Sequence, residues 1–398
     1  MFAFSKAEPN ERRLAGAVFD RPTIVTFRNR LVDFEEGGHT MKTALDYAKQ
    51  GADTLMRKFT VEELPPKNGF HYHQGVFLSG MERTYLLCGE KKYRDYIKAW
   101  VDYYIDEDGE IKHCDVREFD DMQPAILLFN LYKDTGDERY KKVLDKFAPI
   151  VEMWPTNARG GFWHKYHRQN QMWLDTLYMI GPYSVMYASA FDRPYLYETI
   201  YQNMDLMRRN MTDPKTGLLR HAWDDSKVID WCDKETGLSP EFWGRAIGWY
   251  AVALTDILDY IPENHPRRQE FISAERDIVN ALIRYQDEKT GLWYQVVNKG
   301  SEPGNWLETS CSCLYTYAIS KSVKRGILDS SYAKFAHRGY RGVIDTLTFQ
   351  GEDLIVSNIC IGTGVGDYDF YINRPTVQND LHGMGAFLLM CTQYHDAF

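Results

Sequence analysis

Apolar residues recur at spacings of three and four along most of the 398-residue chain, as they do on one face of an α-helix. The pattern predicts about twelve helices. They begin near Thr40, His71, Lys91, Asp120, Asp137, Gln171, Arg193, Glu241, Arg267, Asn305, Ser330 and Asp380. No long linker or low-complexity run divides them, so we expect a single domain over residues 39–398. Residues 1–38 lack the helical period and contain the β-rich run Pro22–Phe27, which predicts an extended N-terminal arm.

The connections between these helices carry a repeated turn. It reads DPKTGL at Asp213–Leu218, DKETGL at Asp233–Leu238 and DEKTGL at Asp287–Leu292, with looser copies at Asp106–Ile111 and Gly160–Trp163. Each copy offers a glycine for positive φ and leads into a short aromatic or β-branched run. The repeating unit is therefore helix, turn with a short strand, and helix, at intervals of roughly 50–70 residues. About six such hairpins, closed into a ring, would place one helix of each pair inside.

This arrangement predicts where the chemistry lies, because the inner helices of a ring begin around one mouth. Polar and aromatic residues collect at these starts and in the turns before them. They are His71, Tyr72 and His73; Asp120 and Asp121; His164 and Lys165; Gln171 and Asp175; His221 and Trp223; Trp243, Arg245 and Trp249; Asn305, Trp306 and Glu308; and Asp380 and His382.

Asp175 is the least expected of these residues. It stands in the stretch QMWLDTLYM, Gln171–Met179, where a helix would be apolar on nearly every face and hence buried. A buried carboxylate costs several kcal/mol unless it is paired or protonated. Asp175 is therefore either one half of a buried salt bridge or an acid whose pKa burial raises. Asp120 differs, because a predicted helix start nearby favours its charged form; as an alternative, Asp120 or Asp121 is only an N-cap.

The other candidates also allow two interpretations. His71 and His73 have the H-x-H spacing of metal ligands, but no third ligand is evident, so we expect hydrogen bonds to a sugar and no metal ion. His164 and His221 stand near tryptophans, an arrangement suited to a sugar ring; the alternative is a pair of core histidines. Arg245 shares a helix face with Trp249 and either meets a substrate carboxylate or pairs with Asp120 or Glu308.

Composition narrows the class of ligand. A hydrophobic fraction of 44% allows a large core, and an aromatic fraction of 14% suits either a stacking surface or an aromatic core. The net charge of -9 argues against nucleic acid or an anionic membrane as a partner. No run approaches the roughly 18 apolar residues of a membrane span, and charges near the N-terminus replace the apolar run of a signal peptide, so we expect a cytoplasmic protein. The 7 cysteines follow no metal-binding or disulfide pattern.

Six motifs together carry a family resemblance. They are Phe70–Phe77, Gly160–Lys165, Gln171–Asp175, His221–Asp224, Ser239–Tyr250 and Asn379–Phe387. In this order they resemble the unsaturated rhamnogalacturonyl hydrolases of glycoside hydrolase family 105, relatives of the unsaturated glucuronyl hydrolases. The resemblance covers the chain from about Thr40 to its end. It implies an all-α (α/α)6 barrel, no cofactor, and a small unsaturated oligosaccharide as the partner, while the oligomeric state and the source polysaccharide stay open.

The resemblance also implies a reaction and roles for residues. Such enzymes remove a 4,5-unsaturated uronic acid, typically linked to rhamnose, by hydrating its C4=C5 bond. The usual rule, which relates the distance between two carboxyl groups to the stereochemical outcome at C1, therefore does not apply. Asp175 would be the acid/base, and Asp120 would orient substrate or water. Substrate binding would fall to His71, Tyr72, His164, Lys165, His221, Arg245, Trp249 and Thr363, the last in a Gly-rich turn that is otherwise only a turn.

Three other functions fit the same ring. A conventional inverting glycosidase would need a general base across C1, and a sugar epimerase would need a pair of acid/base histidines. A sugar-binding protein without catalysis would not need a carboxylate surrounded by apolar residues, and Asp175 therefore argues against that alternative.

Overall fold

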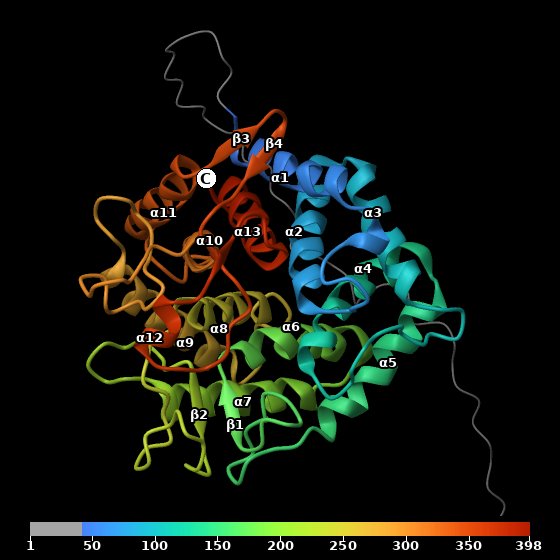
Figure 1. Cartoon of the computed structure of the whole chain (residues 1–398). Coiled ribbons are helices and arrows are strands. Elements are labelled where there is room, and N and C mark those ends of the chain that lie inside the picture. Colours follow the sequence, from blue (N-terminus) through green and yellow to red (C-terminus); the bar gives the residue numbers. More distant parts are fainter. Residues whose placement is uncertain (1–41) are drawn as a thin grey trace, which may run out of the picture.

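The computed structural model describes residues 42–398, so the expected N-terminal arm lies outside the described residues. Within them, twelve helices of ten residues or more form two concentric rings (Figure 1). The inner ring comprises α2 (Tyr72–Cys88), α4 (Ile126–Thr135), α6 (Asp175–Phe191), α8 (Gly244–Ile257), α10 (Thr309–Lys324) and α13 (Leu381–Ala397). The outer ring comprises α1 (Ala44–Lys58), α3 (Lys91–Tyr104), α5 (Glu138–Glu152), α7 (Tyr195–Met211), α9 (Arg268–Leu282) and α11 (Ala333–Asp345).

The ring closes because each inner helix packs against the next and α13 returns to α2. Inner helices are buried on nearly every face; in α10 every residue from Thr309 to Ser322 is buried. Outer helices bury one face and expose the other, as their three-and-four spacing predicts. The predicted ring of six helical hairpins is confirmed.

Glycines allow the first and last inner helices, α2 and α13, to pack closely. A Cβ atom at Gly385 of α13 would lie 2.5 Å from the backbone carbon of Val76 in α2, and one at Gly80 would lie 2.6 Å from Cβ of Leu388. Any larger residue would push the two helices apart. The seam of the ring therefore depends on residues without side chains.

The three repeated turns share one set of hydrogen bonds. Asp213, Asp233 and Asp287 each accept from the backbone N–H and the hydroxyl of the threonine three residues later. The glycine that follows has φ of 70°, 81° and 76° in the three copies. The side chain of the aspartate thus closes a tight turn that glycine completes with positive φ. The turns at Asp213 and Asp287 follow the outer helices α7 and α9, whereas the turn at Asp233 lies further along the connection from α7 to α8.

The small strands correct one prediction. Gln171–Trp173 is not the start of a helix but strand β1, which pairs antiparallel with β2 (Ala222–Asp224). The remaining pairs are β3 (Thr348–Gln350) with β4 (Asp353–Ile355), and β5 (Ile359–Cys360) with β6 (Thr376–Val377). A short helix, α12 (Tyr368–Ile372), and the 3-10 turns η2 (Phe119–Asp121) and η3 (Gln123–Ala125) complete the mouth. No helix in residues 42–398 is long and apolar enough to cross a membrane.

Candidate active site

The starts of the inner helices bring most of the expected residues together. The ring of Tyr72, at the start of α2, lies 6.5 Å from the ring of Trp249 in α8 and 6.4 Å from that of His382 in α13. In the segments before α6 and α8, the rings of Trp173 and His221 are 5.1 Å apart. Residues far apart in the sequence therefore surround one polar and aromatic mouth.

Asp175 is the first residue of α6 and only 8% exposed. Its Oδ2 lies 3.2 Å from Nε2 of His221, whose Nδ1 lies 2.7 Å from the hydroxyl of Tyr371. The β1–β2 pairing produces this contact, because the N–H of Leu174 donates to the carbonyl of His221 at 3.1 Å. A strand register thus places an imidazole beside the buried carboxylate.

The expected rise in the pKa of Asp175 is wrong. Burial raises this pKa, but the imidazole of His221, 3.2 Å away, and the nearby imidazole of His164 together outweigh burial and lower it below its ordinary value. Asp175 is therefore ionised in the free protein at neutral pH. The sequence shows the apolar residues that flank Asp175, but it does not show that His221 lies next to the carboxylate.

Asp120 is 7% exposed and lies in η2. The ammonium of Lys165 lies 2.7 Å from its Oδ2 and 2.6 Å from Oε2 of Glu118. Burial would raise the pKa of Asp120, but Lys165, His164 and His71 together lower it to about 2. The charged state was expected, although for another reason: α4 begins only at Ile126, and Asp120 caps none of the described helices.

Asp121, the neighbour of Asp120, has the opposite environment. Its Oδ2 accepts from the backbone N–H of Asp115 at 2.7 Å. Burial, together with the charge of Asp120, raises the pKa of Asp121 to about 7. The pKa values of these adjacent carboxyl groups are therefore far apart, and of the two Asp120 is the one that forms an ion pair with Lys165.

His164 is a packed, neutral histidine. Its ring stacks on Trp173 with centroids 4.2 Å apart and an interplanar angle of 9°, and its Nδ1 lies 2.9 Å from Oγ1 of Thr176. Burial lowers its pKa to about 4. Trp249 is equally enclosed, at 1% exposure, and stacks on Tyr178 with centroids 4.6 Å apart. Tyr72, by contrast, is partly exposed.

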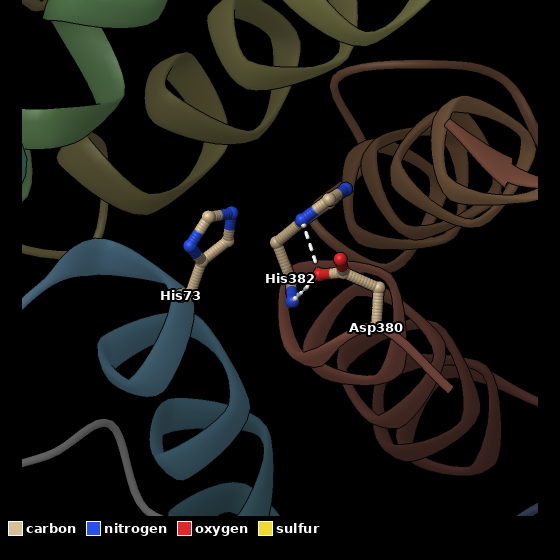
Figure 2. Close-up of side chains that lie close together, drawn as sticks. All are labelled: His73, Asp380 and His382. Carbon is tan, nitrogen blue, oxygen red and sulfur yellow. Dashed lines mark hydrogen bonds and ion pairs between the residues drawn. The ribbon is translucent and has the colours of Figure 1, made fainter. Parts of the chain in front are cut away.

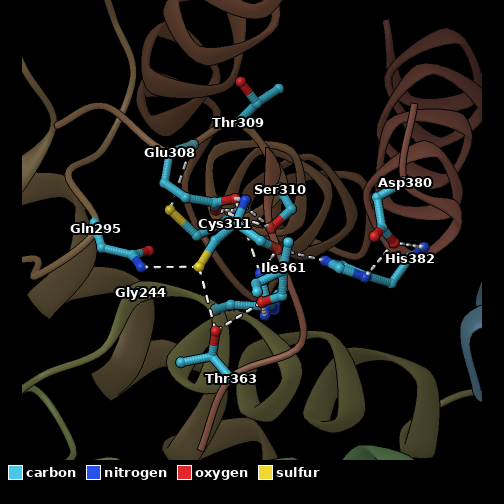
Figure 3. A network of polar contacts seen from close by, with 12 residues as sticks. Gly244, Gln295, Glu308, Thr309, Ser310, Cys311, Ile361, Thr363, Asp380 and His382 are labelled. Carbon is cyan, nitrogen blue, oxygen red and sulfur yellow. Dashed lines mark hydrogen bonds and ion pairs between the residues drawn. The ribbon is translucent and has the colours of Figure 1, made fainter. Parts of the chain in front are cut away.

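Arg245 contacts the protein backbone. Its Nη1 donates to the carbonyl of Cys360 and its Nη2 to that of Ile361, both at 2.6 Å. Glu308, the alternative partner considered above, has Oε1 4.0 Å from Nη1, and also accepts from the N–H of Cys360 at 3.0 Å (Figure 3). The buried pair thus fixes the segment that ends at Thr363. A direct contact between Arg245 and substrate stays a prediction.

Thr363 is partly exposed at the end of that segment. Its hydroxyl donates to the carbonyl of Ile361 at 2.7 Å, and Nε of Arg374 donates to the hydroxyl at 3.2 Å. A Cβ at the neighbouring Gly364 would lie 3.8 Å from the indole of Trp173, so the segment passes close to β1. Thr363 thus lies beside the mouth, and its contact with substrate stays a prediction.

The start of α2 faces the start of α13. His71 is the N-cap of α2 and accepts from the N–H of His73. The rings of His73 and His382 lie 5.0 Å apart, and Nδ1 of His382 lies 2.7 Å from Oδ1 of Asp380 (Figure 2). Sequence reasoning placed Asp380 and His382 at a helix start but gave them no partner. It missed Tyr371, because nothing local in the sequence connects that residue to His221.

The comparisons with known proteins agree with this geometry. The model of Glycosyl Hydrolase Family 88 matches residues 47–398. The chain belongs to glycosyl hydrolase family 88. This family 88 chain is 35% identical to a solved glycoside hydrolase from family 105 of C. acetobutylicum ATCC 824, with a TM-score of 0.83, covering 87% of this chain and 99% of that one.

A curated relative confirms the resemblance drawn from the motifs. The unsaturated rhamnogalacturonyl hydrolase YesR of Bacillus subtilis (strain 168) is 28% identical over 73% of the family 88 chain and 79% of its own length. The unsaturated glucuronyl hydrolase of Bacillus sp. GL1 is 15% identical with a TM-score of 0.63, covering 87% of this chain and 95% of that one, and shows the shared fold alone.

Proposed function

We propose that this glycoside hydrolase removes a 4,5-unsaturated uronic acid from the non-reducing end of oligosaccharides released by a polysaccharide lyase. Unsaturated galacturonyl-rhamnose is the substrate we expect. The observation that carries the proposal is the buried Asp175, held beside His221 at the mouth of the ring. The name of the relative YesR supports the substrate class.

Asp175 supplies the proton chemistry. Protonated Asp175 gives its proton to C4 of the double bond, and its carboxylate then takes a proton from the water that attacks C5. The net change is addition of one water across C4=C5. The hemiketal at C5 opens to a ketone, and the hemiacetal left at C1 releases the neighbouring sugar as an alcohol. Asp175 ends in its starting state.

Substrate binding must raise the pKa of Asp175 for this first step, since His221 lowers it in the free protein. The substrate does so in two ways. Its carboxylate places a like charge near Asp175, and its ring displaces water from an already buried group. Both effects favour the neutral acid. Asp120, held ionised by Lys165, adds a second negative charge to the same mouth.

The neighbouring sugar has room beside Lys165. A cavity of about 240 Å³ is lined by Asp115, Arg117, Glu118, Tyr166 and His167. Glu118 connects it to the catalytic side, because Lys165 bridges Glu118 and Asp120. We place the rhamnose-side residue of the substrate here, where the exposed Tyr166 offers a stacking face.

The test is loss of the ultraviolet absorbance of the double bond in unsaturated galacturonyl-rhamnose. We expect Asp175→Asn to lower kcat by about 10³-fold, within the range of general acid–base catalysis. Asp121→Asn is the control, because Asp121 is a half-buried carboxyl next to Asp120 that accepts from a backbone N–H, and the variant should retain turnover. If Asp175→Asn turns over at the wild-type rate, the assignment of Asp175 is wrong. If the wild-type protein leaves this double bond intact but cleaves the saturated analogue, the C1 glycosidase alternative holds.

A further inference from the structure

Three side chains that the proposed reaction does not use converge where the ring closes. His73 comes from the first turn of α2, His382 from the first turn of α13, and Asp380 is the N-cap of α13. One possible ligand atom from each of the three lies within 4.8 Å of the other two. Figure 2 shows the two imidazoles facing each other across the gap between the helices, with the carboxylate beside His382.

The ring of His382 is oriented by its second nitrogen. Nε2 lies 3.0 Å from the carbonyl oxygen of Cys360, which can only accept a hydrogen bond, so Nε2 carries a proton. This leaves Nδ1 as the nitrogen directed at Asp380. Imidazoles that bind metal ions are held in this way, with one nitrogen donating to a backbone carbonyl and the other facing the metal. His382 is completely buried, so its orientation is fixed.

His73 provides an independent sign of a ligand. Its Nε2 is buried and has no hydrogen-bond partner among residues 42–398. Leaving such a group unpaired costs about 1–3 kcal/mol, so the position calls for a partner that the chain does not supply. Nδ1 of His382 likewise makes no hydrogen bond of good geometry, although Oδ1 of Asp380 is 2.7 Å away.

We propose that His73, Asp380 and His382 bind one divalent transition-metal ion, with Zn²⁺ as the best match. Two imidazole nitrogens and one carboxylate oxygen suit Zn²⁺, Co²⁺ or Ni²⁺, whereas Mg²⁺ and Ca²⁺ prefer oxygen ligands. Ligands about 2.0 Å from the ion stand roughly 3 Å apart, so Asp380 and His382 need to separate by a few tenths of an ångström, while the imidazole of His73 has to close a separation of up to 4.8 Å. Three protein ligands leave a fourth position open.

The position of the site gives the ion a structural effect. It would connect the first inner helix to the last at the seam of the ring, and His382 would transmit the connection to the carbonyl of Cys360, which Arg245 also holds. An ion can enter from the mouth, because Asp380 exposes 23% of its side chain. Binding to the folded chain alone raises thermal stability in proportion to the logarithm of ion concentration. This inference does not depend on the proposed reaction.

The test is titration of the chelator-treated full chain with ZnCl₂ by calorimetry and with CoCl₂ by visible absorption. We expect one saturable equivalent of either ion, a Co²⁺ spectrum of nitrogen and oxygen coordination, and no saturable binding of MgCl₂. His73→Phe and Asp380→Asn should each weaken binding by at least about tenfold. Asparagine keeps the N-cap of α13, so Asp380→Asn removes mainly the charge. His395→Ala, a histidine in the last turn of α13, is the control and should bind as wild type.

Two results would overturn the proposal. One is a wild-type chain that takes up no Zn²⁺ or Co²⁺, or takes them up without saturation. The other is undiminished binding by both His73→Phe and Asp380→Asn, which would place the ion on other residues. The wild-type titration decides the first result without any variant, and the two substitutions lie on different helices, so misfolding of one leaves the other as a test.

Discussion

For Asp175, the sequence predicted the burial of the side chain but not the direction of its pKa shift. Its apolar surroundings were visible, and its burial was therefore expected. The direction of its pKa shift was not, because that direction depends on His221, 46 residues later, which a three-residue strand pairing brings into contact. Local pattern predicts desolvation, whereas the charge partner that outweighs it belongs to the tertiary structure.

The contact between Asp175 and His221 predicts that the loss of unfolding free energy caused by His221→Phe depends on pH. In the wild-type protein the lowered pKa of Asp175 contributes stability above its unfolded pKa of about 3.9, and this is lost as pH falls. In the variant the largest influence that opposes burial, His221, is gone, so burial raises the pKa of Asp175 and stability falls as pH rises through that pKa. The free-energy cost of the substitution should therefore grow between about pH 4 and pH 7, by roughly 1.4 kcal/mol for each pKa unit. Urea unfolding across this range measures it.

The control for this prediction is the same substitution in an Asp175→Asn background. Without the carboxyl group the cost of His221→Phe should become independent of pH over that range. A cost that rises equally with pH in both backgrounds would show that another group is responsible.

At the scale of elements, the spacing of apolar residues predicted the helices because each inner or outer helix is long enough to show its period. The segment that holds Thr363 could not be predicted in this way. The position of this segment depends on Arg245, which lies 115 residues before Cys360 and donates to the carbonyls of Cys360 and Ile361. From the sequence, Arg245 was a candidate for binding the substrate carboxylate. In the structure its guanidinium donates hydrogen bonds that hold a loop in place.

The loop predicts the kinetic effect of Arg245→Lys. Lysine lacks the planar fork whose two nitrogens each donate to one carbonyl, so the segment to Thr363 should lose its fixed position. We expect KM to rise about tenfold, equivalent to roughly 1.4 kcal/mol, with kcat changed much less. Steady-state kinetics on unsaturated galacturonyl-rhamnose would separate the two constants.

Arg268→Lys provides the comparison. Arg268 also donates to two backbone carbonyls, those of Leu258 and Ile261, but it lies in the outer helix α9. Its substitution should affect stability and leave KM unchanged. An unchanged KM for Arg245→Lys, or an equal rise for both variants, would contradict a positioning role for Arg245.

For the whole molecule, the repeated turns were sufficient to predict a closed ring of hairpins. These turns do not show how the first and last inner helices meet to close the ring. That contact joins α2 to α13, more than 300 positions apart, and uses glycines that look unremarkable in a helical pattern. Close packing of two backbones has no periodic signature, so only the structure shows it.

The seam predicts that Gly385→Ala destabilises the protein, although alanine is about 1 kcal/mol better than glycine inside a helix. The new Cβ would lie 2.5 Å from backbone atoms of α2, which cannot move aside without displacing the helix, so we expect a loss of about 2–3 kcal/mol. Gly51→Ala is the control, since its new Cβ would meet flexible side-chain ends of Leu388 and Met384. Equal unfolding midpoints in urea for both variants would contradict this account.

The central claim is that the reaction hydrates C4=C5 and does not break the bond at C1 directly. The measurement that tests it most directly is turnover of unsaturated galacturonyl-rhamnose in heavy water, following absorbance, released rhamnose and deuterium at C4 together. Hydration by Asp175 predicts that absorbance falls at least as fast as rhamnose appears, and that C4 carries one deuterium in a single configuration. Rhamnose appearing while the double bond persists, followed by deuterium in both configurations, would contradict it and show hydrolysis at C1.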